Sequence, residues 1–515
     1  MSAGQSGATV AVLGASYGGA RAACILAQGL PEGWRVVLVD RNDHMNHLYV
    51  LPRFAVLPGH EHKAFIPYNN VFAPPPAFDA PMPPLTAPLK PTPIVNDSRQ
   101  VFLHASITSL SPHSVTLDRA FPEFGVADSD RTLHFDYLVY ALGSHLPSPI
   151  NLWGPIPGED VEKADVLDVS RGTKRGGVAW LKRFHKRVER ASSVLVVGGG
   201  ALGIQFATDI AEIYPTTKVT LLHSRTRLLP RFDEAMHSEI VSSLSSLNVC
   251  TILGDRLDLS SLASKETRDG ERVVRTQSGR EISAELVLLC TGQTPNTALL
   301  RSVFPNSVHA DGPNKGMASV RRTLQLAEPI PADELPDDFA QLSINGDATP
   351  ELAIPSASPE PESEPESPVT DEEEEPVIEE DPKTRVAAEH VFAVGDAADA
   401  FGAVNAGHNA FFQGQLAAHN IIRMVKASER DASSESEPED LTLEKYAPGL
   451  PSIKVSLGLN KSVYQFQGMV GTKEEQQPDL DVHLIWRYYG FNVEREDLET
   501  DFEAEAGAEA AVAGA

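Results

Sequence analysis

The sequence predicts an α/β protein, because strand-like and helix-like segments alternate along most of its 515 residues. Two β-branched strands each run into a glycine turn and straight on into a helix, at residues 9–27 and 192–210. A later strand, at residues 390–399, ends in a Gly-Asp pair and also precedes a helix. Such turns are typical of doubly wound parallel sheets. We therefore expect two Rossmann-like three-layer domains, followed by a small C-terminal α+β domain.

The first glycine turn lies in TVAVLGASYGGARAACILA and is followed by WRVVLVD, a second apolar strand that ends at Asp40. Strand, glycine turn, helix and acidic strand end make a complete dinucleotide-binding unit. Asp40 stands at the distance from the turn at which a carboxylate meets a ribose hydroxyl. Ser16 occupies the middle glycine position, where a small side chain still allows a pyrophosphate to come close. The candidate contacts are Gly14, Ser16, Gly18, Gly19, Asp40 and Arg41.

The second glycine turn lies in SSVLVVGGGALGIQFATDI, and its candidate contacts are Gly198, Gly200 and Gly203. Free backbone amides and the helix dipole make each turn an anion site. One such pattern is a weak signal, whereas two in one chain, each framed by a strand and a helix, indicate two nucleotide cofactors. We expect a bound FAD at one turn and diffusing NAD(P)H at the other. The alternative is that both turns are only structural.

The segment FAVGDAAD supports placing FAD at the first turn. Its strand ends at Gly395, which allows close approach, and Asp396 is expected to accept hydrogen bonds from the ribityl chain. The helix that begins near Gly407 would aim its positive end at the pyrimidine edge of the flavin, where negative charge develops on reduction. The alternative is an ordinary strand-to-helix turn.

The order of these motifs predicts that an NAD(P)H-binding domain is inserted between two parts of an FAD-binding domain. The expected boundaries are 8–150 for the first part of the FAD-binding domain, 165–292 for the NAD(P)H-binding domain, 293–327 and 388–426 for the second part of the FAD-binding domain, 328–387 for an acidic insertion, 441–491 for the C-terminal domain and 492–515 for an acidic tail.

The net charge of -28 is concentrated in segments that lack strand or helix patterning. Residues 359–381 hold twelve acidic residues and no basic one, and residues 428–440 and the tail are also acidic. Such segments bury too little apolar surface to offset their ordering entropy, so we expect all three to be disordered. No basic stripe remains on the folded part, which argues against nucleic acid as a partner.

The three cysteines, Cys24, Cys250 and Cys290, lie far apart in the sequence, each inside an apolar run. This pattern is typical of reduced core thiols, so we expect a cytoplasmic protein. Ser2 rules out N-myristoylation, and no apolar stretch approaches the roughly 18 residues of a spanning helix. The cationic run LKRFHKRVER, residues 181–190, is expected to be a solvated helix face, and the alternative is a patch for peripheral membrane contact.

The strand KVTLLH ends at His223, where an acidic residue would bind a 2′-hydroxyl and repel a 2′-phosphate. Arg225 and Arg227 follow, so two arginines and no carboxylate favour NADPH, with Arg225 as a candidate contact. The alternative is that both arginines face solvent, and NAD(P)H therefore stands for either nucleotide. Four histidines at 44, 47, 60 and 62 match no common metal-ligand spacing, and no metal is expected.

The motifs TVAVLGASYGGARAACILA, LVYALGS, VLVVGGGALG, LVLLCTG and HVFAVGDAAD, in this order, resemble those of pyridine nucleotide oxidoreductases with two dinucleotide domains. HLYVLPRFAVLPGHEHKAFIPY and GLPSIKVSLGLNKS are similar to the apoptosis-inducing-factor family, closest to its ferroptosis-suppressor branch. The resemblance implies that NAD(P)H reduces FAD and that the flavin passes electrons to a quinone or similar small-molecule acceptor. It also implies a contribution to FAD binding from the 141–144 turn, including Gly143.

The resemblance also identifies two catalytic candidates, Lys63 and His408, and two departures. Lys63 is similar to a family position near the flavin. The family's lysine near the start of the distal helix is replaced, with Asn405 and His408 in that neighbourhood. Gln205 replaces a glutamate that commonly follows the nicotinamide turn.

Three reaction classes follow from these patterns. Disulfide reductases of this kind need a paired-cysteine motif, which the sequence lacks, so hydride is expected to leave the flavin directly for an acceptor such as a quinone. A Baeyer–Villiger monooxygenase would need a histidine before a tryptophan in the linker, but Trp180 precedes His185. The remaining alternative is a redox-dependent signalling flavoprotein with slow turnover, for which the acidic segments would be docking or phosphorylation sites.

Overall fold

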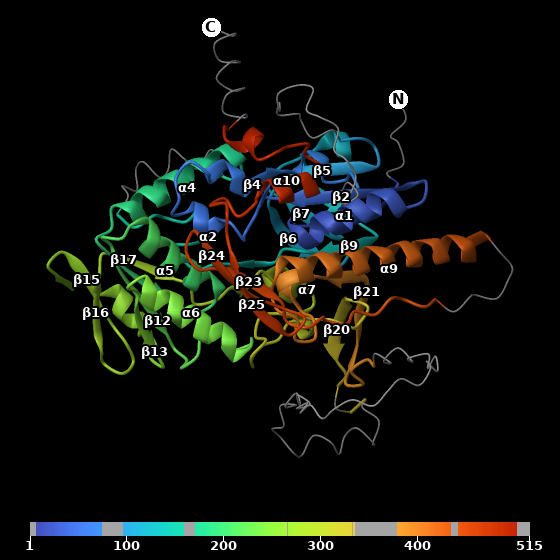
Figure 1. Cartoon of the computed structure of the whole chain (residues 1–515). Helices are drawn as coiled ribbons and strands as arrows, with labels where there is room; N and C mark the ends of the chain where they lie inside the picture. Colours follow the sequence, from blue (N-terminus) through green and yellow to red (C-terminus); the bar gives the residue numbers. More distant parts are fainter. Residues whose placement is uncertain are drawn as a thin grey trace, which may run out of the picture.

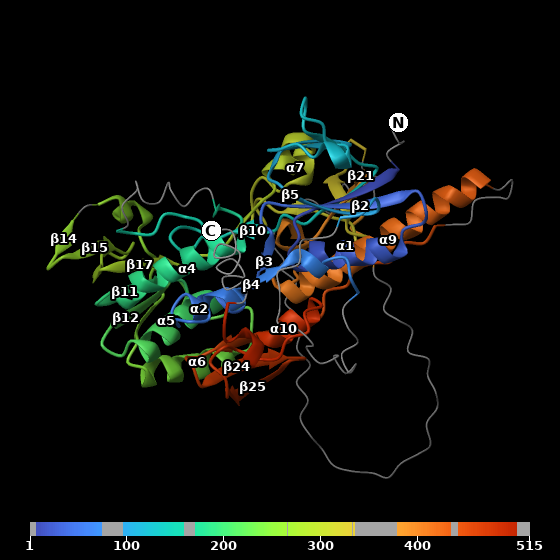
Figure 2. The same ribbon diagram turned by 90° about the horizontal axis from the view of Figure 1, so that it is seen from above.

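Two parallel sheets dominate the computed structural model, which describes residues 7–74, 96–158, 170–264, 266–331, 333–334, 379–433 and 441–501. In Figures 1 and 2 the first sheet, mostly blue, lies on the right and the second, green, lies on the left. The red C-terminal strands lie between them. This arrangement confirms the expected mixed α/β fold with Rossmann-like parallel sheets.

The larger sheet has six strands in the order β20-β21-β9-β1-β2-β5. Its strands are β1 Ala8–Leu13, β2 Trp34–Asp40, β5 Gln100–His104, β9 Tyr137–Tyr140, β20 Gln325–Pro329 and β21 Thr384–Ala393. Neighbouring strands run parallel, except that β20 and β21 are antiparallel. The chain therefore leaves this sheet after β9 and returns to it only at β20.

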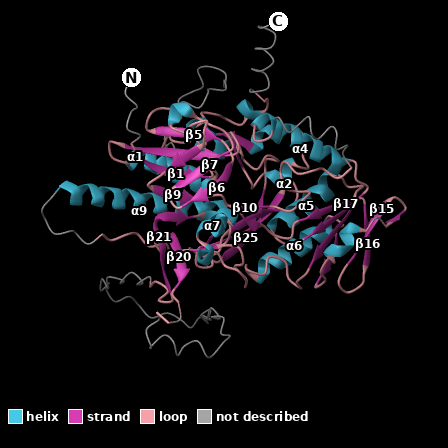
Figure 3. Cartoon of the chain, turned by 180° about the vertical axis from the view of Figure 1, so that it is seen from behind, coloured by secondary structure: helices cyan, strands magenta, loops and turns pink. Residues whose placement is uncertain are grey.

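The centre of this sheet is buried on both faces, which explains its nearly continuous apolar runs. Val10 pairs with Val36, and residues 10–13 and 37–39 have no exposed surface. Helices α1, Tyr17–Gly29, and α9, Gly407–Ser433, pack against each other beside the sheet, as Figures 1 and 3 show. The first glycine turn, which precedes α1, and the Gly395-Asp396 motif, which precedes α9, thus lie near two helices that pack together although they are far apart in the sequence.

The smaller sheet has four parallel strands in the order β13-β12-β11-β17. They are β11 Ser193–Val197, β12 Lys218–His223, β13 Cys250–Leu253 and β17 Leu286–Leu289. Its helices are α4 Lys174–Glu189, α5 Ala201–Ile213 and α6 Glu234–Ser246. The apolar face of α4 is buried through Leu181, Phe184 and Val188, which confirms the expected amphipathic helix.

Short antiparallel pieces flank the two sheets. One antiparallel group precedes β9 and consists of β6 Ile107–Ser111, β7 Ser114–Leu117 and β8 Thr132–His134. The other pieces are β3 His44–Asn46 with β4 Phe65–Pro67, β10 Ser144–His145 with β18 Thr294–Pro295, β14 Thr267–Arg268 with β15 Glu271–Arg275 and β16 Glu281–Ala284, and β19 Ala318–Ser319 with β22 Ala398–Asp399. The remaining short helices are α2 Leu51–Phe54, α7 Ala298–Val303, η1 Glu61–Ala64, η2 Tyr68–Asn70, η3 Pro122–Phe124, η5 Leu259–Ala263, η6 Pro305–Ser307 and η8 Gly395–Ala397.

The C-terminal domain is a three-stranded antiparallel sheet followed by short helices. Its elements are β23 Ile453–Ser456, β24 Lys461–Phe466, β25 Met469–Glu474, α10 His483–Tyr488 and η9 Glu496–Leu498. The expectation that disorder begins at residue 492 is wrong for residues 492–501. Val493 and Leu498 are buried, and apolar side chains that pack on the domain hold this part of the acidic tail in place.

Two further segments are more ordered than their charge predicted. Strands β20 and β21 extend into both ends of residues 328–387, because their backbone groups pair with each other. Helix α9 continues to Ser433, into residues 428–440, since an exposed helix keeps its charged side chains in water. The centre of the acidic insertion, the end of the tail and most of the proline-rich run at 73–93 lie outside the described residues.

Arg53, on α2, joins three parts of the molecule. Its guanidinium forms an ion pair with Asp209 of α5 at 3.0 Å, and both side chains are fully buried. It also donates to the carbonyl oxygens of Pro478 at 2.9 Å and Gly458 at 2.6 Å. Arg53 therefore joins the part of the chain that carries α2, helix α5 and the C-terminal domain.

Among the described residues, no helix is both long enough and apolar enough to cross a bilayer.

Candidate functional site

The first glycine turn joins β1 to α1 and leaves no room for side chains. Gly14 has a φ of +91°, and a Cβ on it would lie 2.4 Å from the carbonyl oxygen of Ala141. A Cβ on Gly19 would lie 1.7 Å from the carbonyl oxygen of Gly14. Only glycine fits at either position, so the backbone at the start of α1 stays bare, as an anion site requires.

Ser16 and Gly18 occupy the middle of this turn. Ser16 precedes α1, and its side chain makes no capping hydrogen bond to the helix. A Cβ on Gly18 would lie 2.7 Å from the carbonyl oxygen of Ala410 on α9. Gly18 therefore lets the two helices approach closely, in addition to its place in the turn.

Asp40 lies at the carboxyl end of β2, beside the turn. Its Oδ2 accepts the backbone N–H of Ala15 at 2.7 Å, and its Oδ1 accepts that of Asn42 at 2.8 Å. Burial raises the pKa of this carboxyl, although the two amide hydrogen bonds favour its charged form. Each oxygen keeps a lone pair, so the carboxylate can still meet a ribose hydroxyl. Arg41 is exposed, and its carbonyl oxygen accepts a hydrogen bond from His104.

The distal motif meets the 141–144 turn at the ends of β21 and β9. Gly395 and Gly143 both have positive φ, at +71° and +59°. The Ser144 hydroxyl donates to Oδ2 of Asp396 at 2.9 Å, and burial raises the pKa of this carboxyl. Two segments about 250 residues apart thus form one polar wall of the expected flavin site, as the spacing of parallel strand ends requires.

The N-terminus of α9 is covered by aromatic side chains. The hydroxyl oxygen of Tyr49 accepts the backbone N–H of Gly407 at 2.9 Å. Tyr17, inside the first glycine turn, is hydrogen-bonded to Nδ1 of His47 at 3.0 Å, and a Cβ on Gly407 would touch its ring at 2.9 Å. His408 is exposed, although partial desolvation lowers the pKa of its imidazole. Sequence analysis did not select Tyr17, although an aromatic residue inside a glycine turn was a usable signal.

The second glycine turn repeats the geometry of the first. Gly198 has a φ of +122°, and a Cβ on it would lie 2.0 Å from the carbonyl oxygen of Cys290. A Cβ on Gly203 would lie 1.9 Å from the carbonyl oxygen of Gly198, whereas one on Gly200 would meet nothing within 4 Å. Gly200 caps α5 without a side chain, so the helix start is open to a pyrophosphate.

A family model described as pyridine nucleotide-disulphide oxidoreductase matches residues 8–311, which include both turns. This chain belongs to that family. FAD and NAD(P)H are its cofactors. The tight turn at Gly14 and Gly19, together with Asp40 and Asp396, fits FAD. The turn at Gly200, where nothing lies within 4 Å of an added Cβ, fits NAD(P)H.

Curated relatives of this oxidoreductase include Fe-regulated protein 8 of Mycosarcoma maydis, 36% identical over 94% of this chain and 96% of that protein. Ferroptosis suppressor protein 1 of Taeniopygia guttata is 27% identical, over 62% of this chain and 70% of that protein. Apoptosis-inducing factor homolog B of Dictyostelium discoideum is 23% identical, over 59% of this chain and 68% of that protein. These relatives confirm the resemblance to the apoptosis-inducing-factor family and its ferroptosis-suppressor branch.

Among solved structures, reduced Bacillus anthracis CoADR-RHD is similar in fold to this oxidoreductase. The TM-score is 0.51, with 14% identity over 89% of this chain. The match spans 61% of that chain, less than two thirds of its length. At this identity the likeness concerns the fold alone.

Lys63 of the oxidoreductase is engaged in ion pairs with the C-terminal region. Its Nζ lies 3.4 Å from Oδ2 of Asp479 and 3.0 Å from Oε1 of Glu499, and its side chain is fully buried. The carbonyl oxygen of Lys63 accepts the indole N–H of Trp486 at 2.9 Å. These contacts give Lys63 a structural role at the domain junction, and its role as a catalytic residue stays a prediction.

Gln205, at the position where the family resemblance led us to expect a glutamate, points to the C-terminal domain. Its Nε2 donates to the hydroxyl of Ser456 at 3.1 Å. Arg225, in the loop after β12, is exposed. The structure thus places Gln205 on α5 near a second domain and Arg225 at the strand end where an adenosine ribose is expected.

All three cysteines of the oxidoreductase are free. Cys24 and Cys290 are buried as expected, but the prediction of a core thiol is wrong for Cys250, which is exposed. The reason is its place at the start of β13, an edge strand of the smaller sheet. Among the described residues, no group of three or more His, Cys, Asp or Glu side chains could hold a metal ion.

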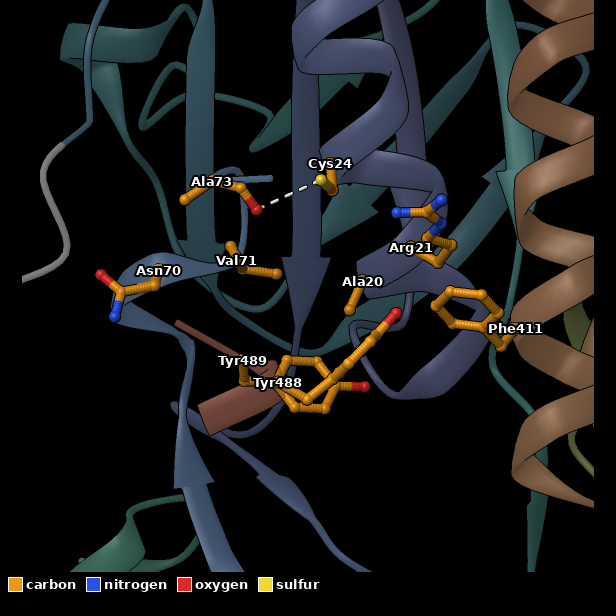
Figure 4. A pocket seen from close by; sticks show the side chains of 9 residues that line it. All are labelled: Ala20, Arg21, Cys24, Asn70, Val71, Ala73, Phe411, Tyr488 and Tyr489. Carbon is orange, nitrogen blue, oxygen red and sulfur yellow. Dashed lines mark hydrogen bonds between the residues drawn. The ribbon is translucent and has the colours of Figure 1, made fainter. Parts of the chain in front are cut away.

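A small, open pocket lies between α1, α9 and α10, beside the first glycine turn (Figure 4). Phe411, Tyr488 and Tyr489 line it with aromatic rings, and the guanidinium of Arg21 lies over the Phe411 ring at 4.8 Å. Cys24 donates its thiol proton to the carbonyl oxygen of Ala73 at 3.2 Å, drawn as a dashed line. The C-terminal helix therefore covers the outer side of the FAD-binding helices.

Proposed function

We propose that this chain moves a hydride from NAD(P)H to FAD and passes the electrons directly to a quinone-type acceptor. The observation that carries the proposal is its cysteine content. Only three cysteines occur in the sequence, at positions 24, 250 and 290, so no pair is close enough in sequence to form a Cys-x-x-Cys relay. An acceptor must then approach the flavin itself.

The residues at the first site suit a flavin that changes charge. When bound, FAD supplies the hydride chemistry. Asp396 and Ser144 offer hydrogen-bonding partners for a polyhydroxyl chain. The N-terminus of α9 carries a partial positive charge, which favours a reduced, negatively charged ring system near it. His408 is exposed at this helix start, where its imidazole could exchange a proton with an acceptor.

The proposed reaction also implies a location for the protein. A quinone with an apolar tail partitions into lipid, so a protein that reduces it must approach a membrane surface. We propose a cytoplasmic protein with peripheral membrane contact. Co-sedimentation of the purified protein with vesicles that contain such a quinone tests this part, and protein that stays in the supernatant contradicts it.

Stopped-flow reduction of the purified yellow protein tests the reaction. We expect NADH or NADPH to bleach the flavin absorbance rapidly, and a quinone to restore it through many turnovers. Slow reduction with a persistent charge-transfer band would instead favour a redox-dependent signalling role with slow turnover. Colourless protein that takes up no added FAD would exclude both functions.

A further inference from the structure

The carboxyl ends of β12 and β13 form one edge of the smaller sheet, next to the second glycine turn. The two strands are parallel neighbours, and β12 also pairs with β11, which leads into that turn. The loops that follow them are joined by backbone hydrogen bonds, from Gly254 N–H to the carbonyl of Arg225 at 2.9 Å and from Asp255 N–H to that of His223 at 3.2 Å. The side chains of both loops therefore belong to one surface.

His223 stands at the end of β12, where a carboxylate would select a free 2′-hydroxyl. Its Nδ1 accepts the backbone N–H of Gly199 at 3.0 Å, and its Nε2 lies 3.2 Å from the carbonyl oxygen of Arg227, to which it donates. A Cβ on Gly199 would lie 2.7 Å from the ring. The imidazole is thus held uncharged beneath the turn, so His223 itself places no negative charge where a phosphate would bind.

Two arginines rise from the two joined loops. Arg225 follows β12 and Arg256 follows β13, and both are exposed. Among the described residues, neither guanidinium forms a hydrogen bond or an ion pair. Burial lowers the pKa of the His223 imidazole, and the nearby positive charges of Arg225 and Arg256 lower it further. Two unpaired guanidinium groups around one strand end are a site for a dianion.

The other charged groups nearby are already engaged. The guanidinium of Arg227 donates to the carbonyl oxygen of Phe232, so it is engaged within the chain. The carboxylate of Asp255 accepts the hydroxyl of Ser278 at 2.6 Å and the backbone N–H of Arg256 at 2.9 Å. Asp255 is therefore fixed by the neighbouring hairpin, and the cluster of Arg225, Arg256 and Asp255 keeps one net positive charge.

We infer that the second nucleotide site selects NADPH over NADH by holding the 2′-phosphate of its adenosine between Arg225 and Arg256. This inference rests on the proposed function, in which the turn at Gly198 binds the nicotinamide nucleotide. It adds Arg256, which lies too far along the sequence from β12 to be chosen from the motif alone.

Equilibrium binding of oxidised nucleotides to the FAD-loaded protein tests the inference without hydride transfer. NADP⁺ and 2′,5′-ADP are compared with NAD⁺ and 5′-AMP. We expect Arg225→Ala and Arg256→Ala each to weaken binding of NADP⁺ and 2′,5′-ADP by about tenfold or more, the usual effect of losing one charged hydrogen bond. Binding of NAD⁺ should change by less than about twofold, because its ribose carries no 2′-phosphate.

Arg190→Ala is the matched control. Arg190 is exposed and follows α4 just before the start of β11. It therefore lies at the amino end of the parallel strands, opposite the carboxyl ends that carry Arg225 and Arg256. Its loss removes the same charge and should leave both nucleotides' affinities unchanged. Thermal denaturation of each variant shows whether it folds.

The possible outcomes distinguish a failure of the 2′-phosphate site from a failure of the proposed function, in which this turn binds a nicotinamide nucleotide. Equal affinity for NADP⁺ and NAD⁺ in the unchanged protein, or an equal loss for both in the two arginine variants, overturns the phosphate site while leaving a nicotinamide site in place. Failure of every nucleotide to bind overturns the proposed function as well. A selective loss of NADP⁺ and 2′,5′-ADP in the arginine variants, absent in Arg190→Ala, supports the inference.

Discussion

At the scale of single residues, the buried ion pair of Arg53 and Asp209 is the strongest test of how the domains are joined. Arg53→Met leaves the Asp209 carboxylate buried without a cation and removes the donors for two carbonyl oxygens. We expect a loss of about 3–5 kcal/mol in unfolding free energy, measured by urea denaturation. The double variant Arg53→Met/Asp209→Leu should recover part of the loss, because no buried charge remains. Equal stability of the single variant and the parent would contradict this reading.

His47 makes the stability of the first site depend on pH. Burial lowers the pKa of its imidazole from 6.5 to about 4. Between these values the unfolded chain binds a proton that the folded chain does not, so folding stability falls as pH drops from 6.5 towards 4. The difference amounts to about 3 kcal/mol at pH 4.

The matched variant is His47→Asn, which keeps a hydrogen-bonding group near Nδ1 for Tyr17 but does not titrate. We expect its unfolding free energy to fall less than that of the parent between pH 6.5 and 4, in denaturation curves measured at several pH values. Parallel losses in the two proteins would show that His47 does not carry the effect. Asp40 and Asp396, whose pKa values burial raises, are present in both proteins and cancel in the comparison.

At the scale of elements, the crossing of α1 and α9 decides whether the first glycine turn is held in place. A Cβ on Gly414 would lie 2.1 Å from the backbone oxygen of Gly18, which cannot move away by changing rotamer. Gly414→Ala should therefore strain the crossing by about 1–3 kcal/mol, which outweighs a gain of about 0.5–1 kcal/mol in helix propensity. We expect a lower thermal midpoint and less retained FAD.

Gly29→Ala is the control at the same crossing. A Cβ on Gly29 would meet the Cδ1 of Ile422 at 2.3 Å, the end of a flexible side chain. Ile422 can rotate away, so this substitution should cost much less than Gly414→Ala. If both variants retain FAD and melt alike, the backbone contact at Gly18 does not govern the turn.

At the scale of the whole molecule, the limits of sequence reasoning follow from the range of the contacts. Gly14, Gly198 and Asp40 were predicted because the turn and its acid are neighbours along the chain, and their geometry recurs in any βαβ unit. Asp396 was placed by the order of motifs. Arg53 was not predicted, because its partners lie more than 150 and more than 400 residues away, at Asp209 and Gly458.

The acidic composition of the tail led to a wrong prediction of disorder for residues 492–501. Residues 492–501 read as part of an acidic tail, yet their few apolar side chains decide their position. Leu498 has no exposed surface, and its carbonyl oxygen accepts a hydrogen bond from Nε2 of His62 at 2.8 Å. The net charge of the tail does not show that Leu498 is buried. No local sequence pattern shows that the carbonyl oxygen of Leu498 is bonded to His62.

This end of the chain closes the molecule by packing rather than by charge. Leu498→Ala removes a fully buried side chain and should cost about 2–5 kcal/mol. Glu499→Gln removes the outer ion-pair partner of Lys63, but Glu499 is 58% exposed, so solvent screens the pair and the loss should stay below about 1 kcal/mol. Lys63 also keeps Asp479 in that variant. Thermal denaturation and limited proteolysis near α10 measure both. A larger effect of Glu499→Gln than of Leu498→Ala would mean that the ion pair, and not the buried leucine, holds the C-terminal region on the FAD-binding side.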